Sequence, residues 1–127
     1  PAPGAGHRTG YSQEVKLKQS PIFARTYDLV KWLIPLTVKF PRHQRFVLAN
    51  AMQGAALALQ ERLIEAVRLP DTGGALRAVD VEVDKLRFYL RLRYDLGYIN
   101  LGQQRHAGQM VAEIGRLLGG WHASLKA

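Results

Sequence analysis

The apolar residues between positions 76 and 90 recur at intervals that alternate between three and four residues. The series consists of Leu76, Val79, Val83, Leu86 and Leu90. This spacing places all of them on one side of an α-helix and is typical of the seam between the helices of a bundle. A helix of this kind has to bury that side against other helices, so the segment predicts an all-α fold.

Three further segments show helical periodicity, and no segment gives a strand signal of comparable quality. The predicted helices span residues 20–39, 42–69, 74–96 and 101–118. Phe40-Pro41 and the run from Pro70 to Gly74 are expected to separate the first three helices. Gly97 is expected to end the third helix and Asn100 to cap the fourth. Gly119-Gly120 is the expected stop of the fourth helix.

Each of these three helices has an apolar side that is expected to face the core. In the first helix it consists of Tyr27, Val30, Leu33, Ile34 and Val38. In the second it consists of Leu48, Met52, Ala55, Leu59, Leu63 and Ala66. In the fourth it consists of Ala107, Met110, Val111, Ile114, Leu117, Leu118 and Trp121. Short connections make neighbouring helices antiparallel, which predicts an up-down-up-down four-helix bundle.

The predicted bundle occupies residues 20–122 of the 127 residues, which suffice for one domain. Residues 1–19 are expected to form a flexible N-terminal tail, because Pro, Gly and Ser are frequent there and no apolar period is present. Residues 123–127 are expected to form a C-terminal tail.

The second and third helices carry more apolar residues than one packed side requires. Val81, Phe88 and Leu92 lie roughly opposite the seam of the third helix, and Phe46, Leu57 and Ile64 lie away from the main stripe of the second. Such a second stripe predicts a subunit interface in a homo-oligomer. The alternative is a thicker bundle core with Phe88 half exposed.

The composition favours a polyanionic partner and a reducing compartment. The formal net charge is +8, and the chain contains no cysteine, which excludes disulfides and cysteine-ligated zinc. No segment has the roughly 20 apolar residues of a membrane-spanning helix, and the first residues lack the apolar core of a signal peptide. We therefore expect no membrane association and a cytoplasmic location. Simple solubility is the alternative reason for the positive charge.

One side of the third helix is charged, and it is the main candidate for binding a nucleic acid. Within about 80° of arc, at about 100° per residue, lie Arg77, Asp80, Asp84, Arg87, Arg91 and Asp95. Arg87, Arg91 and Arg93 in the run LRFYLRLR are expected to contact phosphates, independently of base sequence. The alternative is a solvated face whose arginines and aspartates pair with one another.

Arg42 and Arg45, at the start of the second helix, form a second candidate cluster. Cations are disfavoured at a helix N-terminus, so an external anion can be expected there. Catalysis lacks a comparable basis in the sequence, because the four histidines are scattered and form neither an i,i+4 pair nor a Glu-x-x-His motif. We therefore expect no catalytic residues, no metal and no cofactor.

Three runs of sequence resemble the accessory variability determinant (Avd) family of diversity-generating retroelements. They are FPRHQRF at 40–46, LRFYLR at 86–91 and EIGRLLGGW at 113–121, and the resemblance covers about residues 22–122. The family belongs to a wider group of four-helix-bundle proteins that includes proteins encoded in ribosomal-RNA intervening sequences.

The resemblance implies a non-catalytic protein that forms a barrel-like homopentamer. It implies binding to the retroelement's reverse transcriptase, to its template RNA and to DNA, in support of mutagenic reverse transcription. Arg87 and Arg91 match positions of the family's basic surface. Asp80 and Asp84 depart from that pattern and would shift binding toward Arg42 and Arg45. A helical scaffold that binds proteins but no nucleic acid remains the alternative function.

Overall fold

The computed structural model describes residues 21–39, 45–68 and 70–126. These segments form four α-helices and one short π-helix, with no strand among them. The α-helices are α2 (Pro21–Val38), α4 (Asn50–Arg68), α5 (Thr72–Asp95) and α6 (Leu101–Lys126), and the π-helix η2 (Arg45–Ala49) precedes α4. The predicted tail at 1–19 lies outside the described residues.

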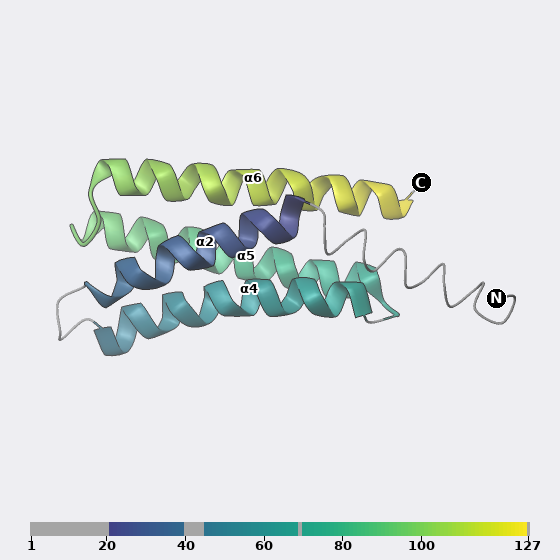
Figure 1. The fold of residues 1–127 in the computed structure, drawn as a ribbon, viewed down its shortest axis with the longest axis horizontal. Coiled ribbons are helices and arrows are strands. Elements are labelled where there is room, and N and C mark those ends of the chain that lie inside the picture. The colour runs from purple at the N-terminus through teal and green to yellow at the C-terminus, as the bar shows by residue number, and fades with distance from the viewer. Residues whose placement is uncertain (1–20, 40–44, 69, 127) are drawn as a thin grey trace, which may run out of the picture.

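The four α-helices lie side by side with their axes roughly along one direction (Figure 1). Each helix runs opposite to the one before it in the chain, and α2 packs against both α4 and α6, while α5 packs against α4 and α6. This arrangement confirms the predicted four-helix bundle with up-down-up-down order.

The core is built largely from the stripes that the sequence predicts. Every seam residue of α5 from Leu76 to Leu90 is buried. In α4 the residues from Met52 to Ala66 of the predicted stripe are buried, and in α6 Ala107, Val111, Ile114 and Leu118 are buried. Burial of such aliphatic side chains supplies the main driving force that holds the helices together.

The predicted core side of the first helix is wrong by about a quarter turn. Tyr27 and Val38 are more than half exposed. The buried residues of α2 are Ile22, Phe23, Thr26, Leu29, Leu33 and Thr37. Thr37 can be buried because its hydroxyl donates to the carbonyl oxygen of Ile34 and accepts from the Gln53 side-chain amide. A polar residue type therefore takes a core position that the apolar pattern does not mark.

Two predicted helix ends are also wrong. Helix α5 begins at Thr72, because the Asp71 carboxylate accepts a hydrogen bond from the Gly74 backbone N–H and caps the first turn. Helix α6 continues through Gly119 and Gly120 to Lys126, so residues 123–126 of the predicted tail extend this helix. Neither glycine has a positive φ angle, so neither forms a helix stop.

The turn between α5 and α6 follows the prediction. Gly97 has a φ angle of 80°, a left-handed conformation that glycine adopts without steric cost. Asn100 accepts from the Gln103 backbone N–H, and the Gln103 side chain accepts from the Asn100 backbone N–H. This reciprocal pair of hydrogen bonds caps the N-terminus of α6. It therefore fixes the residue at which α6 begins after the turn that follows α5.

Candidate nucleic-acid interface

The charged side of α5 is exposed, and its pairing is loose. The Arg87 and Arg91 side chains are 54% and 78% exposed. Arg87 Nη1 lies 3.5 Å from Asp84 Oδ1, and Arg91 Nε lies 3.3 Å from Asp95 Oδ2. Exposed pairs of this kind contribute at most about 1 kcal/mol. Both guanidinium groups can therefore exchange their carboxylate partner for a stronger anion at small cost.

Asp80, which the alternative interpretation would pair with an arginine of α5, contacts a residue of another helix. Asp80 instead lies 3.0 Å from Nε2 of His122 on α6, and so connects the two helices near the C-terminal end of α6. Arg77 is exposed on the same side of α5 as the other charged residues.

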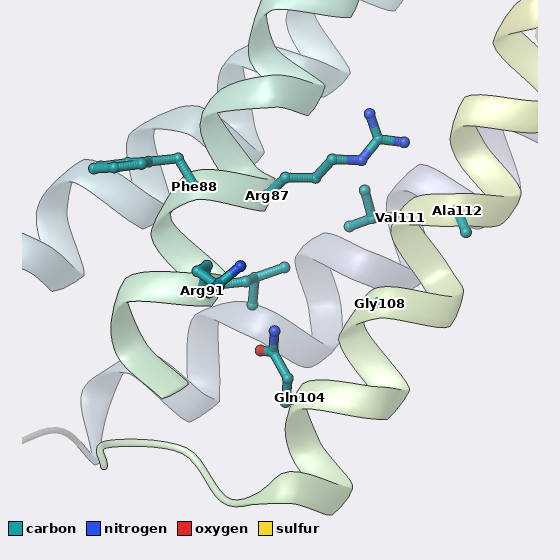
Figure 2. A pocket seen from close by; sticks show the side chains of 8 residues that line it. Arg87, Phe88, Arg91, Gln104, Gly108, Val111 and Ala112 are labelled. Atoms are coloured by element: carbon teal, nitrogen blue, oxygen red, sulfur yellow. The ribbon is translucent and has the colours of Figure 1, made fainter. Parts of the chain in front are cut away.

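A groove of about 400 Å³ lies between α5 and α6, beside the two arginines. Its lining residues are Arg87, Phe88, Leu90, Arg91, Gln104, Gly108, Val111 and Ala112. Figure 2 shows Arg87 reaching across the groove toward α6, whereas the Phe88 ring points the other way. The groove thus has two guanidinium groups on its α5 side and uncharged residues on its α6 side.

Arg93 lies in the core, which contradicts its predicted place on the nucleic-acid surface. Its side chain is fully buried, at 0% exposure. Burial lowers the pKa of Arg93 to about 10, and the nearby Tyr98 opposes that shift. A signal for this position was present, because Arg93 continues the seam one step of three residues beyond Leu90. Arg93 is therefore not part of the proposed interface.

The second predicted basic cluster stays a prediction. Arg42 lies outside the described residues, and of Arg45, the first residue of η2, only the backbone is described.

A cation elsewhere on α6, Arg116, is held more firmly than Arg87 or Arg91. The Arg116 guanidinium donates to both carboxylate oxygens of Glu113. This hydrogen bonding lowers the pKa of Glu113 and raises the pKa of Arg116. Arg116 is therefore a weaker candidate for binding an external anion.

The predicted second apolar stripe is exposed. Leu57 and Ile64 of α4 are 45% and 44% exposed, and Val81 and Phe88 of α5 are 51% and 62% exposed. Each pair is spaced by seven residues, so its members lie on one side of their helix. Leu92 is half-buried, and the Phe46 side chain is outside the description. Exposed apolar residues grouped on adjacent helices are typical of protein contact sites.

The described residues contain no group of three His, Asp or Glu side chains that could hold a metal ion. Within these segments, no helix has the length and apolar character needed to cross a membrane.

His106 packs its ring against Trp32, with the two ring centroids 4.9 Å apart.

The fold and the groove define a four-helix bundle with a basic surface on α5 and an exposed apolar surface on α4 and α5. Residues 21–125 match the family model described as bAvd-like, and the chain belongs to this family. The match confirms the resemblance to accessory variability determinants and indicates an accessory protein of a diversity-generating retroelement. A comparison with curated protein sequences finds no match.

Proposed function

We propose that this protein is a non-catalytic accessory subunit that binds the template RNA and the reverse transcriptase of a diversity-generating retroelement. It acts in the cytoplasm and supports the mutagenic copying of the template. The bAvd-like family match supports the association with a reverse transcriptase.

One observation supports the nucleic-acid contact most directly. Arg87 and Arg91 are exposed, loosely paired and one helical turn apart beside the same groove. One turn is about 5.4 Å, a separation that suits two guanidinium groups contacting one phosphate backbone. The net charge of +8 adds long-range attraction for RNA or DNA. Arg77 extends the basic row along α5.

Self-association is the second part of the proposal. The exposed residues Leu57, Ile64, Val81 and Phe88 supply an apolar contact surface on α4 and α5. We propose that this surface packs against a second copy of the chain, in a closed homo-oligomer with five subunits. A ring would repeat each basic groove once per subunit and so bind a long polyanion by many weak contacts.

The test compares the double variant Arg87→Ala with Arg91→Ala against the unaltered protein in RNA binding at several salt concentrations. Two lost charge-assisted contacts are expected to weaken binding about 10- to 100-fold. The slope of log affinity against log salt is expected to fall by about 1.4 for single-stranded RNA. The matched control is Arg25→Ala with Lys31→Ala, which removes the same charge from the exposed side of α2.

Equal weakening in the control would show that binding depends on total charge and not on this groove. Unchanged affinity in the Arg87 and Arg91 variant would contradict the proposed interface. A protein scaffold that binds no nucleic acid is the second candidate function. The exposed apolar surface favours it, because a scaffold would use the same surface for protein contacts. Absence of any RNA or DNA shift in a gel at physiological salt would select the scaffold.

A further inference from the structure

Gly115 of α6 lies beside the tip of the Arg87 side chain. A Cβ atom at this position would lie 3.0 Å from Arg87 Nη2. Favourable contacts between non-bonded carbon atoms occur at about 3.5–4.0 Å, so a side chain at position 115 would require the Arg87 guanidinium to shift by a few tenths of an ångström. At Gly108 and Gly119 of the same helix, a Cβ would meet no atom within 4 Å.

The Arg87 side chain has two neighbours, one on each of the helices α5 and α6. Asp84 on its own helix lies 3.5 Å away, and the bare α6 backbone at Gly115 lies under its tip. Figure 2 shows the extended side chain crossing from α5 toward α6. Contacts that restrict a long side chain before binding reduce the conformational entropy that it loses when it binds a ligand.

We propose that Gly115 is a positioning residue for the nucleic-acid contact of Arg87. The missing side chain lets the guanidinium lie across the α5–α6 groove, on the side where Arg91 also reaches solvent. Both guanidinium groups then face one phosphate backbone. This inference rests on the proposed function, because it concerns the same groove and the same ligand.

The test is Gly115→Gln, which fills the space of the Arg87 guanidinium without changing any charge. Glutamine favours the helical conformation more than glycine does, so the variant is expected to fold. Binding of a fluorescein-labelled single-stranded RNA is expected to weaken about 3- to 10-fold, and the salt slope to fall by about 0.7 as one phosphate contact is lost. Gly119→Gln is the matched control, with the same chemical change and no neighbour to displace, and its affinity is expected to stay unchanged.

A double-mutant cycle separates positioning from a direct effect of the new side chain. In the Arg87→Ala background, Gly115→Gln is expected to cause no further loss of RNA affinity. A further loss of the same size there would overturn the inference, since Gly115 would then act without Arg87. Equal loss in Gly119→Gln would overturn it as well.

The two proposals fail in different ways. If Arg87→Ala weakens RNA binding and Gly115→Gln does not, the positioning role is wrong and the proposed interface stands. If Arg87→Ala leaves RNA binding unchanged, the interface itself is wrong, and the positioning role falls with it. Light scattering on each variant checks that the subunit count is the same as in the unaltered protein.

Discussion

Helix α5 has two exposed surfaces, and the free energy of exposing them to water differs. Toward α6, Arg87 and Arg91 hold charged groups in water, which is their preferred environment. On its other exposed side, Val81 and Phe88 hold apolar groups in water, where burial would be favourable. The first surface is stable as it stands, and the second gains stability only when something covers it.

This difference suggests that one side of α5 serves assembly and the other serves polyanion binding. Figure 2 shows that Arg87 and Phe88, although adjacent in sequence, point in opposite directions. Phe88 also lines the α5–α6 groove, so a subunit that packs on its ring would border the groove, and we expect it to leave the side facing α6 open to a ligand. Assembly and polyanion binding can then be altered separately, and variants that do so test the comparison.

The largest expected effect is loss of assembly in Phe88→Glu. A carboxylate in the centre of an apolar interface would be buried without a partner, which is strongly unfavourable. We expect the mass measured by light scattering to fall to that of a single chain. Tyr27→Glu is the control, because Tyr27 is similarly exposed, at 59%, but lies on α2.

An unchanged mass in Phe88→Glu would show that the apolar surface of α5 is not the contact between copies. Equal dissociation in both variants would indicate a general effect of added negative charge.

The next largest effect is a difference in stability between variants of Arg91 and Arg93, which are two residues apart. Arg93→Ala removes a fully buried side chain and is expected to lower the free energy of unfolding by about 2–4 kcal/mol. Arg91→Ala changes an exposed side chain and is expected to change it by no more than about 0.5 kcal/mol. Urea denaturation followed by circular dichroism measures both values.

RNA affinity should show the reverse order. Under conditions where both variants are folded, Arg91→Ala is expected to bind RNA more weakly and Arg93→Ala to bind as the unaltered protein does. A stable Arg93→Ala variant with weakened RNA binding would place Arg93 in the interface after all.

Most of the fold could be predicted because the strongest stripes consist of large aliphatic residues. In α5 no other set of apolar residues between Leu76 and Leu90 is spaced as regularly as the seam. The structure buries every residue of that seam. The apolar pattern fails in α2, where Thr26 and Thr37 are buried while Tyr27 is exposed. The Thr37 hydroxyl has hydrogen-bond partners in Ile34 and Gln53, and residue type alone does not reveal them. The Thr26 hydroxyl has no hydrogen-bond partner among the described residues, so hydrogen bonding does not explain its burial.

The candidate site could be predicted in part. Exposure of Arg87 and Arg91 follows from their helical position relative to the seam. The burial of Arg93 was missed because residue type was given more weight than the position that continues the seam. The position of the Arg87 guanidinium beside Gly115 involves two helices, and helical periodicity within one segment carries no information about it.

The smallest expected effect concerns Arg116, which contrasts with Arg87 in how firmly it is paired. Arg116 donates to both oxygens of Glu113, whereas Arg87 has a single long contact with Asp84. The pKa of Glu113 is lowered in the folded protein, chiefly by this hydrogen bond. The pair therefore stabilises the fold fully above the ordinary pKa of a glutamate, and that contribution is lost as the pH falls through the lowered folded pKa.

We expect Arg116→Gln to return the pKa of Glu113 toward its ordinary value, which an NMR titration of the Glu113 carboxyl carbon would measure. Arg87→Gln serves as the comparison and should leave the Glu113 titration unchanged, because Arg87 pairs with a different carboxylate. Arg116→Gln should also weaken RNA binding less than Arg91→Ala does, since Arg116 is committed to its own carboxylate. If the two variants weakened RNA binding equally, firm pairing would not decide which cations bind the polyanion, and the interface would extend around α6 beyond the groove.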